Sequence, residues 1–274
     1  MTATAFLRAR LLPLFVDHAG RVILVVGAVM LVVYISATEA LRKPNGRVVF
    51  GDATHHFVQL RSLVFDRDVD LQNDYMRIYG LTKYEPETDW IFYDHTATGK
   101  VRNYMPVGPA LLWAPLYLLV VIGQTALANL GLAARPDGFD HVLQVVPGVT
   151  GVIAGTAAAR VSWQIARRFA SPTSAAISAL GMWLGSNALY YSLVSPSYSH
   201  TASMFACSLF FWHWLCSDAQ WSPGRAAVSG AAAGLATLMR WQDALLLAIP
   251  LFEAIRAPLP ARTRVFSAAA AAGA

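Results

Sequence analysis

Hydrophobic residues are grouped along the chain into long blocks that short polar stretches separate. The first block covers residues 21–38, and a polar, aromatic stretch of residues 39–106 follows it. A helix needs about 20 apolar residues to cross the hydrocarbon core of a bilayer, so the longer blocks predict membrane-spanning helices. The later apolar blocks cover residues 107–133, 141–166, 175–193, 201–216, 226–239 and 244–255.

Positive charge around the first block predicts its orientation. Arg8, Arg10 and Arg21 lie at or before its start, and the acidic sequence of the next polar stretch follows it. Because cytoplasmic flanks of membrane helices are rich in Lys and Arg, we expect a cytoplasmic N-terminus. Residues 39–106 are then a long extracytoplasmic loop, and loops of that length usually have a function of their own.

The later connectors carry arginines too. The side of the membrane on which these arginines lie depends on whether the second apolar block, residues 107–133, crosses it, and both alternatives are open. All arginines share the cytoplasmic side if residues 107–133 do not cross the membrane, which Pro109 and Pro115 would favour by interrupting the helix. The joints SPSYSH and RWQD then face outside, beside the long loop. If residues 107–133 do cross, both joints lie in the cytoplasm. The later arginines are at positions 167, 168, 225, 256, 262 and 264.

Composition agrees with a membrane protein and excludes several other classes. Of the 274 residues, 56% are hydrophobic and 14% are charged, and the mean hydropathy is +0.45. The net charge of +5 does not indicate nucleic acid, because the basic residues sit at the ends of apolar blocks rather than in one patch. Cys207 and Cys216 fall on opposite faces of one predicted helix, so a disulfide between them is excluded, and zinc-ligand spacing is lacking.

The two ends of the chain suggest one membrane module that is cut short. We interpret residues 21–38 as an uncleaved anchor rather than a signal peptide, because more hydrophobic blocks follow. Residues 265–274 begin an alanine-rich apolar helix without completing it. We therefore expect residues 1–274 to form a single transmembrane module that is the N-terminal part of a longer protein, or the product of a truncated reading frame.

The stretch GDATHHFVQLRSLVFDRDVDLQNDY, residues 51–75, gathers acids and histidines directly after the first block. Ala53, Phe57, Leu60 and Val64 form one apolar stripe at helical spacing, which predicts an amphipathic helix on the outer membrane surface. Asp52 begins this helix. It is either an ordinary N-cap or a carboxylate that acts in catalysis or ligand binding.

Two histidines lie within reach of Asp52 on the predicted helix. His55 and His56 follow it by three and four residues, and a histidine beside a carboxylate can take part in acid–base or substrate-binding work. The alternative is that both are histidines wetted by lipid headgroups. Only one of them can face the same way as the polar stripe.

Three aspartates further on have the spacing that opens a calcium-binding loop. Asp66, Asp68 and Asp70 match its first three ligand positions, but Leu71 stands where glycine is required and Arg77 where glutamate is required. This segment is therefore interpreted as a solvated turn. The alternative is a weakly held divalent cation.

Several cations and polar residues are candidates for binding an anionic substrate at the outer surface. Arginine offers a two-pronged donor to phosphate, although a single cation can equally contact lipid headgroups. Arg240 and Asp243 interrupt an otherwise apolar stretch, which marks them as functional candidates. His200 begins a block after a serine-rich joint and faces the same side. The remaining candidates are Arg61, Lys100 and Arg102.

The order of these motifs resembles a known family. GD is followed by RSLVFDRDVDLQNDY, then by NYMPVGPALLWAP, SPSYSH and LMRWQDALLL. The pattern is similar to the N-terminal part of GT-C membrane glycosyltransferases, and among them to family 39, the protein mannosyltransferases and lipid A aminoarabinose transferases. The resemblance implies an all-α, polytopic transmembrane bundle. Its first extracytoplasmic loop carries amphipathic juxtamembrane helices.

The resemblance also implies an activity, a place and partners. The chain would sit in the plasma (inner) membrane and move a sugar from a polyprenyl-phosphate donor to a hydroxyl acceptor at the outer face, with inversion. Asp52 matches the acidic residue that serves as base or binds metal, and Arg61, Arg240 or Lys100 would stabilise the phosphate. The family often has a second acid where this chain has His200, so the use of a divalent cation stays open.

Two other functions are compatible with the sequence. A transporter or flippase of a lipid-linked substrate would line a path through the bilayer with charged residues, whereas here the acids gather in the loop. A non-catalytic membrane scaffold or an inactive fragment would account for the missing second acid and for the unfinished C-terminal helix.

Overall fold

The computed structural model describes residues 18–42, 46–83, 90–216 and 222–256, and this part of the chain is helical, without a β-sheet. Three helices are long and apolar enough to cross a membrane: Gly20–Ala40, Gly108–Asn129 and His141–Ala166. This supports the all-α fold class and a membrane-associated protein. The predicted cytoplasmic arginines Arg8 and Arg10 and the alanine-rich residues 265–274 lie outside the described residues.

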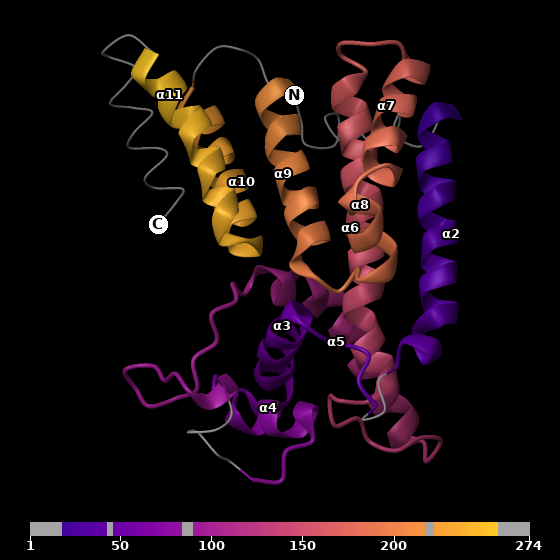
Figure 1. The fold of residues 1–274 in the computed structure, drawn as a ribbon, viewed down its shortest axis with the longest axis vertical. Helices are drawn as coiled ribbons and strands as arrows, with labels where there is room; N and C mark the ends of the chain where they lie inside the picture. The colour runs from indigo at the N-terminus through magenta and orange to yellow at the C-terminus, as the bar shows by residue number, and fades with distance from the viewer. Residues whose placement is uncertain (1–17, 43–45, 84–89, 217–221, 257–274) are drawn as a thin grey trace.

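Apart from Gly108–Asn129, the long helices form a bundle whose axes run roughly along the long axis of the molecule (Figure 1). α6 (His141–Ala166) is central and packs against α2 (His18–Leu41), α7 (Pro172–Leu184) and α9 (Ser199–Cys216). α10 (Pro223–Met239) covers the far side of α9.

Glycines on α6 make its close packing with the neighbouring chain segments possible. A Cβ atom at Gly148 would lie 1.9 Å from the Tyr34 hydroxyl, and one at Gly151 would lie 1.7 Å from the Pro196 carbonyl oxygen. Small residues let helix backbones approach closely where lipid gives no hydrophobic drive to association. The glycines of α6 therefore determine how near α2 and the connector before α9 can come.

The apolar blocks correspond closely to the helices, with two differences. Block 141–166 coincides with α6 because Asp140 caps its first turn and an arginine pair follows it. Block 175–193 is not one helix: α7 ends at Leu184, and the short helix α8 (Asn187–Leu189) and the π-helix η3 (Tyr190–Val194) follow. The break is at Gly185 and Ser186, where the Ser186 hydroxyl accepts from the amide of Ala188. Block 244–255 consists of the 3₁₀ helix η4 (Trp241–Leu247) and α11 (Ala248–Arg256).

The long loop folds into a compact unit at one end of the bundle, the loop end, where α2 ends and α6 begins (Figure 1). We call residues 46–83 and 90–107 the loop cluster. It contains α3 (Asp52–Arg61), the π-helix η1 (Ser62–Asp66), α4 (Gln72–Tyr79) and the short 3₁₀ helix η2 (Trp90–Phe92).

The apolar stripe of α3 faces protein, which corrects the expectation that this helix lies on the membrane surface. Ala53, Phe57 and Leu60 are buried in one core with Trp113 and Tyr117 of α5 (Gly108–Asn129). The Phe57 and Tyr117 rings meet edge to face at 6.1 Å between centroids. This core anchors the loop cluster to α5.

Both ends of α5 lie at the loop end of the bundle. Its first residue is so close to the end of α10 that a Cβ at Gly108 would lie 2.2 Å from the carbonyl oxygen of Leu238. Near its other end, the Gln124 amide donates to Asp140, the cap of α6, at 2.9 Å. α5 therefore runs between the end of α10 and the start of α6, and whether it crosses a membrane is left to experiment. Its outer side chains Leu119 and Ile122 are exposed.

An ion-pair network ties the loop cluster to the connector before α6. The Arg61 guanidinium donates to Asp66 and Asp74 through Nη1, and to the Asp137 carbonyl oxygen through Nε and Nη2. Asp74 is buried, and burial raises its pKa to about 7 although Arg61 opposes the shift. Its Oδ2 has no hydrogen-bond partner among the described residues, an arrangement that disfavours the charged form.

Replacement of Asp74 should change how stability depends on pH. Its folded-state pKa of about 7 exceeds the ordinary value of about 4. Asp74 therefore favours the folded state most below about pH 4, and this contribution is lost as the pH rises through about 7. We expect wild type to lose thermal stability relative to Asp74→Asn as the pH rises from about 4 to about 7, with no further relative change above that. Thermal unfolding in detergent measures this, with the accessible Asp94→Asn as control, and parallel curves for wild type and Asp74→Asn would contradict it.

Cysteine labelling tests the arrangement of α5. In a Cys207→Ala, Cys216→Ala background, single cysteines replace the exposed residues Thr98, before α5, and Ala134, after it. Because both ends of α5 lie at the loop end, an impermeant thiol reagent should reach both cysteines from the same side of intact cells. A cysteine at the exposed Ala170, at the other end of α6, should react only from the opposite side. Labelling of positions 98 and 134 from different sides would show that α5 crosses.

Candidate functional site

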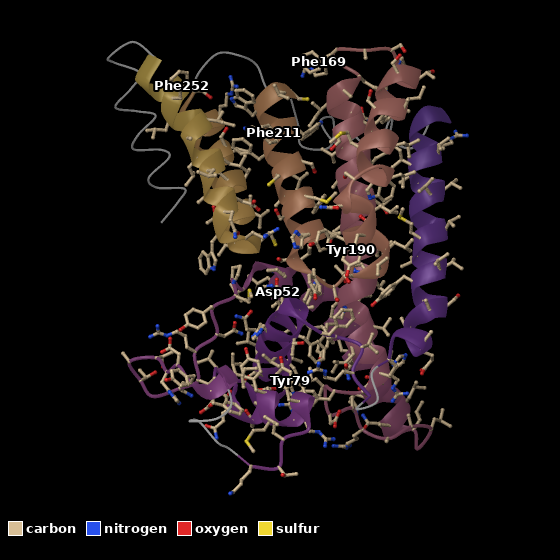
Figure 2. All side chains as sticks on the ribbon, in the orientation of Figure 1. Asp52, Tyr79, Phe169, Tyr190, Phe211 and Phe252 are labelled. Atoms are coloured by element: carbon tan, nitrogen blue, oxygen red, sulfur yellow. The ribbon has the colours of Figure 1, made fainter. Side chains whose placement is uncertain are left out.

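Three segments that are far apart in the sequence meet at the loop end of the bundle: the start of α3, the SPSYSH connector and the RWQD turn. Gly51 lies against Tyr198, and Arg240 Nη1 donates to His200 Nδ1 at 2.6 Å. The Trp241 indole donates to the Tyr104 carbonyl oxygen at 3.1 Å, which joins the RWQD turn to the loop cluster. Figure 2 shows Asp52 at this junction between the loop cluster and the bundle.

Gly51 determines how α3 begins. Its φ of +57° lies in the left-handed region, and a Cβ atom here would be 2.1 Å from the Tyr198 hydroxyl. Gly51 is also the N-cap of α3, and no side chain caps this end. The interpretation of Asp52 as the N-cap is therefore wrong, because Asp52 is the first residue of the helix and its carboxylate is not used for capping.

The Asp52 carboxylate is exposed, and it makes no hydrogen bond or ion pair with any residue that the structure describes. The charge of Asp52 nevertheless affects the pKa values of two neighbouring residues. Burial is the main cause that raises the pKa of Tyr198, and the charge of Asp52 adds to it. The same charge opposes the burial that lowers the pKa of His55. The exposed Asp52 side chain at the start of α3 is therefore open to a ligand.

The polar residues of the RWQD turn are held against α9. Arg240 contacts His200 in the first turn of α9, and the Ser203 hydroxyl donates to Asp243 Oδ2 at 2.6 Å. The imidazole of His200 also stacks on Tyr191, with 3.6 Å between ring centroids and 15° between planes. Arg240 makes no ion pair with the described residues, so its positive charge is not cancelled by a contacting carboxylate.

The two histidines of α3 have different surroundings. His56 is fully buried, donates from Nδ1 to the Pro106 carbonyl oxygen at 3.0 Å and meets Trp113 edge to face. Burial lowers its pKa to about 4, so it is neutral at physiological pH and ties α3 to the start of α5. His55 is half-buried and shares a 2.7 Å hydrogen bond with the Tyr75 hydroxyl. His55 lies near Asp52, whereas His56 faces away from the site.

The remaining predicted cations are not gathered at this junction. Arg61 is committed to Asp66, Asp74 and the Asp137 carbonyl oxygen, as described above. Lys100 Nζ lies 3.3 Å from Asp70, and Arg102 Nη1 lies 3.5 Å from Asp94. Each of these cations is paired with a carboxylate of the loop cluster or with the connector between α5 and α6. Arg240, in contrast, contacts His200, and the charge of Asp52 acts on the same imidazole.

The aspartates with calcium-loop spacing form a turn. Asp68 Oδ1 accepts from the Ser62 hydroxyl at 2.9 Å and from the Asp70 amide at 3.0 Å, while Asp66 pairs with Arg61. Among the described residues there is no group of three or more His, Cys, Asp or Glu side chains arranged to hold a metal ion. These contacts agree with the interpretation as a turn.

Sequence reasoning did not single out Tyr191, Tyr198 and Ser203 as site residues. Tyr198 lies in the SPSYSH motif, so the motif itself was a signal. Tyr191 precedes His200 by nine residues, and only the break after α7 brings its ring onto the imidazole. Ser203 is one turn beyond His200 on α9, a spacing that could have marked both as facing one neighbour.

Replacement of Gly51 by alanine tests the contact at the start of α3. Positive φ costs a side-chain-bearing residue about 1–2 kcal/mol, and the clash with Tyr198 should add about 1–3 kcal/mol. The control is Gly80→Ala, since Gly80 has φ +69° and nothing within 4 Å of an added Cβ. Thermal unfolding in detergent should show the larger loss for Gly51→Ala, and Tyr198→Phe should relieve part of it. Equal losses in the two alanine variants would contradict the contact.

The arrangement unites a carboxylate, a guanidinium and an imidazole at a bundle end that the loop cluster partly covers. Such a set can accept a proton, bind an anion and donate a hydrogen bond to a substrate oxygen. No protein-family model, curated protein or solved structure matches the chain.

Proposed function

We propose that the chain belongs to a membrane glycosyltransferase of the GT-C type, which transfers a sugar from a polyprenyl-phosphate donor to a hydroxyl group at the outer face of the membrane. The observation that carries the proposal is the meeting of Asp52 and Arg240 at one end of the bundle, neither of them ion-paired with a described residue. A base and an anion-binding cation are the two groups that this reaction requires.

Asp52 is suited to act as the general base. It would take the proton of the acceptor hydroxyl while the hydroxyl oxygen forms a bond to the anomeric carbon of the sugar. The bond from that carbon to the phosphate oxygen breaks on the opposite side, and its electron pair stays on the phosphate. The anomeric centre is inverted, and the proton on Asp52 then passes to water.

Arg240 is suited to bind the phosphate of the donor. Breaking the sugar–phosphate bond increases the negative charge of the phosphate, and a guanidinium placed beforehand stabilises that charge without rearrangement. Arg61, Lys100 and Arg102 are less suited, because each is already paired with a carboxylate. His200, bonded to Arg240, adds a further polar contact next to the same position.

The proposed membrane placement follows from surface character. Val25, Val29 and Val32 of α2 are exposed and apolar, as a lipid-facing surface requires. Arg167 and Arg168 lie beyond the end of α6 that is opposite to the loop cluster. By the positive-inside rule that end is cytoplasmic, so the site faces outward on a multi-pass inner-membrane protein with a cytoplasmic N-terminus. A polyprenyl donor cannot leave the bilayer, so its phosphate would lie where the outer surface of the membrane meets water. The site would contact the phosphate there.

Loss of the base should abolish most of the transfer. We expect membranes that contain wild-type protein to consume a radiolabelled polyprenyl-phosphate sugar from a panel of such donors. Asp52→Asn should reduce the rate at least about a hundredfold, because a general base contributes that much or more. The control is Asp94→Asn, which removes only a surface ion pair in the loop cluster and should keep the rate within about threefold.

Three other outcomes would change the assignment. If no donor of the panel is consumed, the transferase proposal is wrong. If wild type and Asp52→Asn turn over equally, the chain is an enzyme whose base is another residue. If vesicles with this protein alone move a lipid-linked sugar across the bilayer without transfer, the chain is a flippase.

A further inference from the structure

The contact between Arg240 and His200 determines which nitrogen of the imidazole carries a proton. Arg240 Nη1 lies 2.6 Å from His200 Nδ1. A guanidinium has only donors, so a hydrogen bond at this distance requires a bare Nδ1 with its lone pair toward the arginine. A neutral imidazole has one N–H group. The proton is therefore on Nε2, which makes no hydrogen bond with the described residues.

The ring of His200 is held in place from its face as well as from its edge. Tyr191 stacks on it at 3.6 Å between centroids, and Tyr198 lies nearly parallel at 6.3 Å. Arg240 is itself fixed, because its amide donates to the Ala236 carbonyl oxygen and Asp243 of the same turn accepts from Ser203. The contact that restrains the edge of the imidazole thus comes from an anchored residue.

We propose that Arg240 and Tyr191 hold His200 as a neutral donor whose Nε2–H group is directed to an oxygen of the bound substrate. Tyr191 is a positioning residue in this arrangement, since it acts on the substrate only through the ring of His200. The identification of the oxygen as part of a polyprenyl-phosphate sugar rests on the proposed function. The protonation pattern of the ring does not.

A neutral donor fits the charges that surround this ring. Asp52 and Asp243 are the carboxylates that act on it electrostatically, and Arg240 is the cation. An imidazolium would repel Arg240 and attract the Asp52 carboxylate, which has to remain a base. A neutral ring leaves Asp52 open to the acceptor proton and still supplies a directed hydrogen bond.

Nuclear magnetic resonance of protein labelled with ¹⁵N-histidine tests the protonation pattern directly. The ring signals of His200 are assigned by their loss in His200→Gln. In wild type in detergent near neutral pH we expect a neutral ring with its proton on Nε2 and a bare Nδ1. Arg240→Met removes the donor and should give a mixture of the two tautomers. The control Gln242→Met changes an exposed neighbour in the same turn and should leave the signals unchanged.

Kinetics of the transfer reaction test the positioning role. Tyr191→Phe keeps the stacked ring and should keep the turnover, whereas Tyr191→Leu should lower kcat about tenfold with little change in KM, because a loosened donor weakens transition-state contacts. His200→Ala should lower kcat about a hundredfold, as loss of one such donor does elsewhere. His200→Gln can place an amide N–H near the position of Nε2 and should recover part of that loss.

Each result separates this inference from the proposed function. A proton on Nδ1, or a doubly protonated ring in wild type, overturns the inference even if transfer is active. A bare Nδ1 with no transfer from any donor keeps the neutral donor and overturns the glycosyltransferase. Equal kcat in Tyr191→Leu and Tyr191→Phe overturns the positioning role of Tyr191. If Arg240→Met does not fold, the wild-type spectrum alone decides the tautomer.

Discussion

The apolar contact between α3 and α5 is the interaction on which the site depends. α3 follows α2 through a polar segment and would be free to lie anywhere at the end of the bundle if its stripe faced lipid. Instead Phe57 and Leu60 are buried with Trp113 and Tyr117, and burial of large side chains such as these contributes about 1.5–3 kcal/mol each. Because α5 lies between the end of α10 and the start of α6, this core places Asp52 at a defined distance from α9 and α10.

The sequence alone predicted the helices well and their partners poorly. The length of an apolar block is a local property, so the ends of α6 could be read from Asp140 and the arginine pair that follows. The interruption at Gly185 was missed because no proline marks it and the hydrophobic block continues on both sides. The apolar stripe of α3 was found, but lipid and α5 offer the same apolar surface, and periodicity cannot distinguish them.

The candidate site shows the same limit. Position in the chain indicated that Asp52, His200 and Arg240 would share one end of the bundle if residues 107–133 do not cross the membrane, and separate ends if they do. It could not indicate which carboxylate each cation meets. Arg61 contacts Asp74 and Asp137, 13 and 76 residues further along, and only tertiary packing brings them together. The stacking of Tyr191 on His200 likewise depends on the π-helical turn after α8.

The distribution of ion pairs distinguishes the site from the rest of the loop cluster. Arg61, Lys100 and Arg102 each lie within 4 Å of a carboxylate, whereas Arg240 faces a neutral imidazole and Asp243 a hydroxyl. A partly buried charge that contacts only neutral partners regains less of its lost hydration free energy than a charge that contacts an opposite charge. Arg240 and Asp243, at the junction of the three segments, are in this situation, whereas Arg61, Lys100 and Arg102 in the loop cluster are not. The charges of Arg240 and Asp243 are therefore not neutralised by their contacts, and an anionic ligand at Arg240 would supply the partner that this cation lacks.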